Sequence, residues 1–234
     1  MAAADRDAIC NRLSDLTGLP VLDGWSPGGT LWSRGIRFTN GPFLDIHNLP
    51  PDGLEPEPSL LLRGGLREAE TLVRHRGWRL TTNLRSDMPQ EVASPWSLGY
   101  FDRGQGVLSK IGLIEYEIDP AMCGNAEFAG KLFAPDSAPA AGAILERIWI
   151  GTEDVDRAEA DLACLGFRPA GEFSSVGQPA VGRRLRGETG DVVLCEGGGG
   201  VLRLDIAAAR ETTVLRFVGV TAVLTGGGPS LAAA

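Results

Sequence analysis

Hydrophobic positions in residues 144–167 follow a strand period and then a helix period. Residues 148–150, Ile-Trp-Ile, form a short apolar run that is typical of a buried strand. The apolar positions after it recur at helical spacing: Val155, Ala158, Leu162 and Leu165. Thr152 or Asp154 can cap this helix with a side-chain oxygen, and Gly166 suits its end because glycine adopts the left-handed conformation without strain. The stretch therefore predicts a strand, a capped turn and a helix.

The same arrangement occurs twice more along the chain. Residues 7–19 predict a helix that ends at Gly18, because apolar side chains recur there at helical spacing. Residues 59–78 predict an apolar strand, a Gly-Gly break and a helix that ends before Gly77. Three similar segments indicate one supersecondary unit that the chain uses repeatedly.

The remaining apolar segments are short and predict strands. Asn40-Gly41 joins strands at 31–38 and 43–49 as a hairpin, because both residues tolerate positive φ. Further strands are predicted at residues 78–82, 97–102, 111–119, 181–186, 192–196, 201–206 and 212–224. Proline and glycine mark connecting segments at 50–58 and 134–143.

Four sequence strings carry a resemblance to a known family. They are IWIGTEDVDRAEADLACLGF, LSDLTGLPVLDGWSPGGT, FLDIH and PWSLGYFDRGQG, and their order and spacing matter more than any one of them. The chain resembles the vicinal oxygen chelate superfamily, and within it the glyoxalase-like domain proteins of the glyoxalase, bleomycin resistance and dioxygenase type. The resemblance implies an α+β fold, in which repeated βαβββ modules form curved mixed sheets with helices on their outer faces.

The resemblance also implies how the chain is divided. Residues 1–133 would form an N-terminal half of two modules, 134–143 a linker, and 144–234 a C-terminal half of one module with extra strands. Module one departs from the family, because only residues 1–4 precede its helix and its first strand is missing. An uncovered sheet edge invites aggregation. We therefore expect a strand from 212–224 to pair with module one, in the same chain or across a homodimer.

Composition limits the kinds of binding partner and the cellular compartment that we expect for the protein. The net charge of −8 argues against a nucleic-acid partner, because phosphate binding needs clustered lysine and arginine. No apolar stretch approaches the ~20 residues that a membrane span needs, and the start of the chain lacks the order of a signal peptide. The four cysteines show no metal-binding spacing. These features predict a reduced, cytoplasmic protein, and the resemblance implies a small-molecule ligand.

The resemblance implies where a metal would bind. Family ligands come from the first and last strands of paired modules, and Asp45, His47 and Glu115 fall at last-strand positions. Carboxylate and imidazole suit one divalent Zn, Ni, Mn or Fe ion. Glu117 would serve as a catalytic base. No predicted first strand supplies the histidine that is usual in the family, so these side chains could instead line a polar cavity or face solvent.

Aromatic side chains suggest a cavity without a metal. Trp25, Trp96 and Tyr100 would line it together with Asp45, His47 and Glu115, since small-molecule sites are mostly apolar with a few polar groups. Packing in the core is the alternative for each aromatic residue. In the strand predicted at 111–119, acidic and apolar residues alternate. Its acidic side chains, Glu115 and Glu117, could therefore point outward to solvent.

Two functions remain open from the sequence. The first is a metal-assisted lyase, isomerase or dioxygenase of the vicinal oxygen chelate type, which holds a small organic ligand in a cupped sheet. The second is a metal-free protein that binds or sequesters a small molecule in the same cup.

Overall fold

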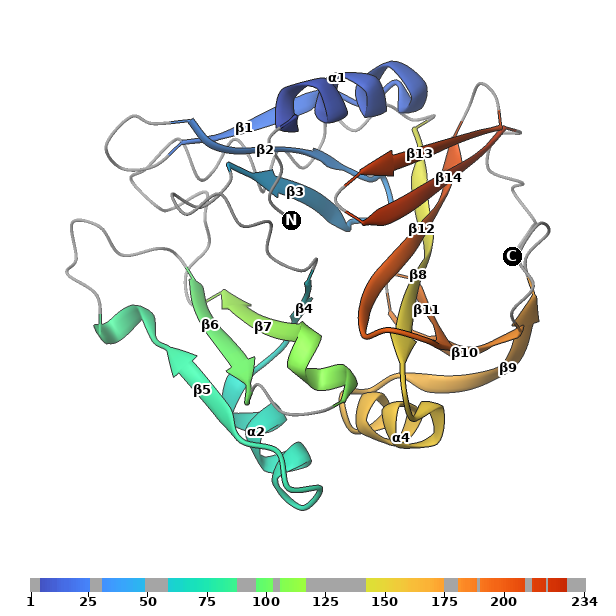
Figure 1. Cartoon of the computed structure of the whole chain (residues 1–234). Coiled ribbons are helices and arrows are strands. Elements are labelled where there is room, and N and C mark those ends of the chain that lie inside the picture. The colour runs from blue at the N-terminus through green and yellow to red at the C-terminus, as the bar shows by residue number, and fades with distance from the viewer. Residues whose placement is uncertain are drawn as a thin grey trace. The chain divides into compact units, whose positions relative to one another are not determined.

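The fold is α+β and consists of two compact units (Figure 1). The computed structural model describes residues 5–25, 31–48, 59–87, 96–102, 106–116, 142–174, 181–188, 190–208, 212–217 and 219–226. Unit 1 contains Met1–Pro58, Glu127–Ile148 and Leu202–Ala234, and unit 2 contains Ser59–Ala126 and Trp149–Val201. The predicted linker at 134–143 lies largely outside the described residues, and the predicted division into halves stays a prediction.

Unit 1 begins with one helix on a three-stranded sheet. Helix α1 spans Arg6–Thr17 and ends at Gly18, whose φ of 73° is left-handed as predicted. The strands that follow pair in the order β1-β2-β3. Their bounds are Val21–Trp25 for β1, Leu31–Arg37 for β2 and Phe43–His47 for β3. The Asn40-Gly41 hairpin is confirmed between β2 and β3. Strand β1 was not predicted; Asp23 and Gly24 interrupt its apolar residues.

Unit 1 also receives strands from later in the chain. Its second sheet segment has the order β13-β14-β12-β8. The bounds are Ile144–Thr152 for β8, Gly200–Ala208 for β12, Thr213–Phe217 for β13 and Val220–Gly226 for β14. Strand β14 runs parallel to β12 and antiparallel to β13. Strand β8 begins in unit 1 and ends in unit 2.

The predicted pairing of residues 212–224 with module one is wrong within the chain, while pairing across a homodimer stays a prediction. Strand β13 pairs with β14 and β14 pairs with β12, and neither joins the β1-β2-β3 sheet. Parallel pairing of β12 with β14 satisfies the backbone of the C-terminal strands within their own segment. Both ends of the chain nevertheless belong to unit 1. The hairpin of module one contacts the start of β8 instead, since Asn40 Nδ2 donates to the Leu145 carbonyl over 2.8 Å.

Unit 2 opens with a complete βαβββ module. Its strands pair in the order β4-β7-β6-β5, with β4 parallel to β7 and the other pairs antiparallel. The elements are β4 (Leu60–Arg63), α2 (Leu66–Arg74), β5 (Leu80–Asn83), β6 (Trp96–Phe101) and β7 (Ile111–Tyr116), with 3-10 turns at Arg85–Asp87 and Val107–Lys110.

A second βαβββ module completes unit 2 and confirms the predicted repeat. The end of β8 leads through α4 to a sheet with the equivalent order β8-β11-β10-β9. The bounds are Val155–Cys164 for α4, Arg168–Ser174 for β9, Val181–Arg186 for β10 and Asp191–Glu196 for β11. Asp154 caps α4 by accepting the Arg157 backbone N–H over 2.9 Å, which settles the choice between Thr152 and Asp154. Strand β9 was not predicted, because its exposed sequence shows no apolar period.

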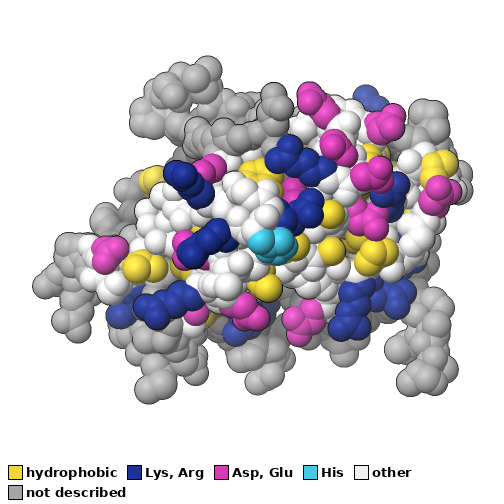
Figure 2. All heavy atoms as spheres, turned by 90° about the horizontal axis from the view of Figure 1, so that it is seen from below, with side chains coloured by type: hydrophobic (Ala, Val, Ile, Leu, Met, Phe, Trp, Pro, Cys, Tyr) yellow, Lys and Arg dark blue, Asp and Glu magenta, His cyan; other side chains and the backbone are white. Residues whose placement is uncertain are grey.

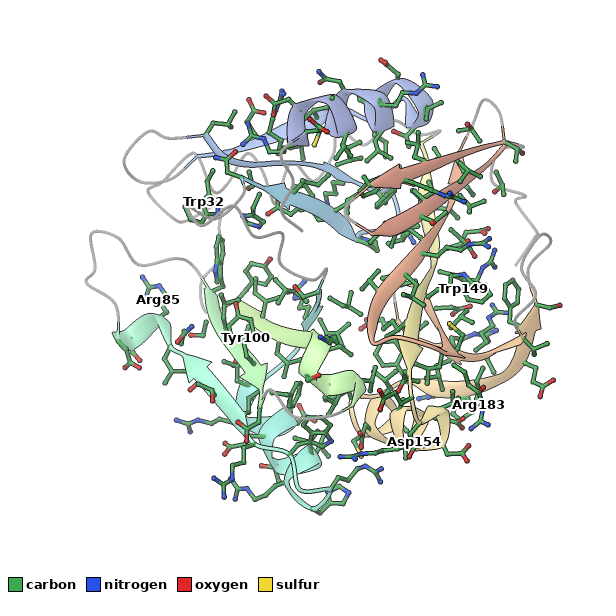
Figure 3. All side chains as sticks on the ribbon, in the orientation of Figure 1. Trp32, Arg85, Tyr100, Trp149, Asp154 and Arg183 are labelled. Carbon is green, nitrogen blue, oxygen red and sulfur yellow. The ribbon has the colours of Figure 1, made fainter. Side chains whose placement is uncertain are left out.

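The helix side of unit 2 is polar and balanced in charge. Figure 2 shows acidic and basic side chains interspersed on the side that carries α2 and α4. Arg183 binds Asp156 over 2.5 Å and Glu159 over 2.8 Å, and Figure 3 shows it beside α4. Arg76 pairs with Asp161, which is only 1% exposed. In the part of the chain that the structure describes, no helix is long and apolar enough to cross a membrane.

Candidate functional site

The strand register shows which residues lie on each face of the sheet formed by β4, β5, β6 and β7. Side chains of directly paired residues lie on the same face. Trp96 pairs with Tyr116, and Tyr100 pairs with Gly112. Leu61 pairs with Gly112. Arg63 lies on the same side of the sheet as Leu61, because Leu61 and Arg63 are alternate residues of β4. We call this side the aromatic face and define it by six residues: Leu61, Arg63, Trp96, Tyr100, Gly112 and Tyr116.

Helix α2 covers the opposite face of this sheet. Leu66, Ala69 and Val73 are its buried side chains, and a methyl group at Gly99 of β6 would lie 2.8 Å from Leu66. Glu115 belongs to this covered face, since its Oε2 accepts the Leu66 backbone N–H over 2.9 Å. The carboxylate therefore caps α2, whose own N-cap residue makes no side-chain bond. Its predicted role as a metal ligand stays a prediction.

The aromatic face is open to solvent at its centre. Leu61 is 46% exposed and Tyr100 is 42% exposed. Gly112 lies between them, and a methyl group there would stand 2.5 Å from Leu61 Cδ2 and 3.2 Å from Tyr100 Cδ1. Leu61 and Tyr100 thus lean over a strand position that has no side chain. Tyr100 is labelled on β6 in Figure 3.

Ring contacts continue the face towards the end of β4. The Trp96 and Tyr116 rings meet edge to face, with centroids 6.1 Å apart and planes at 80°. The Arg63 guanidinium stands over the Tyr116 ring, 5.5 Å from its centroid. Partial burial raises the pKa of Tyr100 because it disfavours the phenolate. The Tyr100 hydroxyl is accordingly neutral at physiological pH and can donate a hydrogen bond.

The face of the β1-β2-β3 sheet away from α1 has a different chemistry from the aromatic face. Ser33 pairs with His47 and Gly35 with Asp45, so these four residues share one side; we call them the polar face. His47 Nε2 lies 3.2 Å from Asp45 Oδ2, and the Ser33 hydroxyl donates to the same oxygen over 3.4 Å. The side chains of Asp45 and His47 are 30% and 38% exposed. Asp45 and His47 therefore lie side by side on one face of β3.

The described residues supply an incomplete donor set for a metal. Catalytic sites usually bring three protein ligands. Asp45 and His47 bring two, while Glu115 belongs to unit 2 and caps a helix. Within the described ranges, no group of three or more His, Cys, Asp and Glu side chains can hold a metal ion. Glu117 and the side chain of Trp25 lie outside the described residues.

Four residues of the aromatic face were missed from the sequence: Leu61, Arg63, Gly112 and Tyr116. Arg63 and Tyr116 lie on strands that were predicted, but no motif drew attention to them. Their signal is alternation, because Leu61 and Arg63 share one side of β4 while Ile114 and Tyr116 share one side of β7. The register that brings these pairs together is a tertiary feature.

Arg147 of β8 takes part in a partly buried ion cluster. Its Nε donates to Asp205 Oδ2 over 2.9 Å, and Arg203 Nε donates to Asp205 Oδ1 over 2.5 Å. Arg147 also binds Glu146 over 2.6 Å. Two carboxylates and two guanidinium groups balance the charge, as buried ions require. These contacts give Arg147 a structural role between β8 and β12.

Comparison with known proteins identifies the fold. No family model matches the chain, and no curated protein matches it. A hypothetical protein from Staphylococcus aureus is similar with a TM-score of 0.58 and 9% identity, over 89% of this chain and 90% of that chain. A variant of homoprotocatechuate 2,3-dioxygenase from B. fuscum is similar with a TM-score of 0.61 and 12% identity, over 97% of this chain and 69% of that chain. At these identities the likeness shows the fold alone, which is the fold that the vicinal oxygen chelate resemblance implies.

Proposed function

We propose that this protein binds a small aromatic molecule on the aromatic face of unit 2. The observation that carries the proposal is the pair of exposed side chains, Leu61 and Tyr100, that lean over Gly112 on a sheet face that α2 does not cover. The resemblance to the vicinal oxygen chelate superfamily supports this proposal, since ligands of that family lie on the sheet side away from the helices. The activity would be binding or sequestration of the molecule.

Physical chemistry favours a flat aromatic ligand at this place. A ring laid over Leu61 and Tyr100 would remove their exposed apolar surface from water. Such burial contributes about 25 cal/mol per Å², and favourable ring geometry adds roughly 0.5–1.5 kcal/mol. The neutral Tyr100 hydroxyl would orient a polar group of the ligand. Leu61 and Tyr100 fill the place of a side chain at Gly112, so the ring would lie against their exposed outer surfaces.

Calorimetric titration with naphthamide, a neutral aromatic probe, tests this function. The double variant Leu61→Ala with Tyr100→Ala should bind naphthamide about tenfold more weakly than the natural chain, because it loses apolar and ring contacts. Leu72→Ala is the matched control, since Leu72 is 41% exposed on α2 and lies on the covered side. Equal affinity of the double variant and the natural chain would overturn the proposal.

A metal-assisted lyase, isomerase or dioxygenase is the second candidate, and the 3.2 Å pair of Asp45 and His47 favours it. A metal bound to the native state raises the melting temperature by mass action. If this candidate holds, the purified protein contains stoichiometric Zn, Ni, Mn or Fe, and a chelator lowers its melting temperature. Asp45→Ala should then abolish the chelator shift while changing the free energy of unfolding of the metal-free protein by less than about 0.5 kcal/mol. A protein without metal and without a shift would exclude the candidate.

A further inference from the structure

We propose that Arg63 makes the aromatic face selective for aromatic molecules that carry a carboxylate or another anionic group. This inference rests on the proposed function, because it assigns a chemical class to the ligand of the same face. Arg63 is the last residue of β4 and stands at the end of the face. Its role is recognition of the ligand's charge.

The geometry places one cation at the end of a row of rings. Trp96 contacts the Tyr116 ring edge to face, and the Arg63 guanidinium stands 5.5 Å from the centroid of that ring. A guanidinium stacked on a ring keeps its planar N–H groups directed outward along its edges, where a carboxylate can accept two parallel bonds. Tyr116 therefore holds Arg63 in place for an anionic group, while the rest of the ligand lies over Leu61 and Tyr100.

No described residue of the aromatic face balances the charge of Arg63. The strand positions on this side carry Thr, Asn, Leu, Ile, Gly, Trp and Tyr besides Arg63, and none of the described ones is acidic. On the helix side of the same unit, Arg76 and Arg157 share Asp161, and Arg183 has two acidic partners. No ion pair of Arg63 is found within the described residues of unit 2. An anionic ligand would supply the missing counter-charge.

Naphthoate and naphthamide form a matched pair of probes for this inference, because they share the ring system and differ in charge. Calorimetric titration of Arg63→Met should show naphthoate binding weakened roughly tenfold, since a hydrogen-bonded charge pair is lost, and naphthamide binding unchanged. Raising the ionic strength should weaken the binding of naphthoate alone. Arg63→Lys should retain part of the preference for naphthoate, because it keeps the charge without the planar fork.

Arg67→Met is the control variant for charge. Arg67 is exposed on α2, so its loss changes the net charge equally on the covered side of the same sheet. It should leave the affinities for both probes unchanged, and melting temperatures should show that both variants fold. Equal losses of naphthoate and naphthamide binding in Arg63→Met, or no loss, would overturn the inference and leave the proposed function standing. If the Leu61 and Tyr100 double variant binds naphthamide normally, the proposed function fails and the inference fails with it.

Discussion

The polar face of unit 1 and the aromatic face of unit 2 are the same part of a module with opposite chemistry. Each lies on the sheet side away from a helix, α1 in one unit and α2 in the other. The polar face centres on Asp45 and His47, while the aromatic face centres on Tyr100 and Leu61. A glycine lies in each face, Gly35 in the first and Gly112 in the second.

The difference shows which positions of a βαβββ module are free to change. Alternate strand residues under the helix must be apolar, because they form the core with the helix. The residues between them face outward and are not bound by that requirement. Unit 1 uses these positions for an acid, an imidazole and a hydroxyl, and unit 2 uses them for rings and one guanidinium. One backbone arrangement can thus present a polar pair or an aromatic surface.

The two glycines give the sharpest test of the comparison. A methyl group at Gly35 would lie 2.2 Å from the Leu44 carbonyl oxygen and 2.8 Å from Phe43 Cζ, so the backbone would have to move. Gly35→Ala should lower the free energy of unfolding by about 3 kcal/mol, and Gly112→Ala by less than about 1 kcal/mol, because exposed Leu61 and Tyr100 can rotate away. Denaturant unfolding measures both, and equal losses would contradict the distinction.

The covered side of the unit 1 sheet should be sensitive to alkaline pH through Cys10. Burial raises the pKa of this fully buried thiol from 9.0 to about 11. Because the folded pKa is raised, the stabilisation is complete below pH 9 and is lost as the pH rises towards 11. The loss should reach up to roughly 2 kcal/mol. Unfolding curves of the natural chain and Cys10→Ala between these pH values isolate the effect, and parallel curves would contradict it.

The covered side of the unit 2 sheet should respond to a change at Glu115. Glu115→Gln keeps an acceptor for the Leu66 N–H but removes the negative charge at the N-terminus of α2. The expected loss of unfolding free energy is about 0.5–1 kcal/mol, with naphthamide binding unchanged. Weakened naphthamide binding without a loss of stability would show that Glu115 serves the ligand, contrary to its place under the helix.

Local signals in the sequence predicted most helices and several strands. The apolar period and Gly18 predicted α1, and the Asn40-Gly41 pair predicted the β2–β3 hairpin, because each depends on neighbouring residues. Strand β9 escaped prediction, since it is largely exposed and carries no apolar period. The pairing of β14 with β12 could not be predicted either, because it depends on contacts between segments that are distant in sequence.

In the candidate sites too, contacts between neighbouring residues could be predicted from the sequence, and contacts between distant residues could not. Asp45 and His47 are two residues apart on one strand, so their proximity could be predicted from alternation. Glu115 accepts a bond from a residue 49 positions earlier, and the sequence gives no sign of that contact. Arg63 and Tyr116 meet only through the parallel register of β4 and β7. Tertiary register decides which predicted strands share a surface.

The interleaving of the two units has a consequence for synthesis of the chain. Unit 1 is drawn from three segments of the chain and unit 2 from two, so the growing chain passes between the units four times. Domains generally fold as units while the chain leaves the ribosome. Unit 2 is complete once Val201 has emerged, whereas unit 1 must wait for β13 and β14. Helix α1 packs on β1, β2 and β3 soon after it is made, but the unit to which it belongs is completed last, so unit 2 can fold before unit 1.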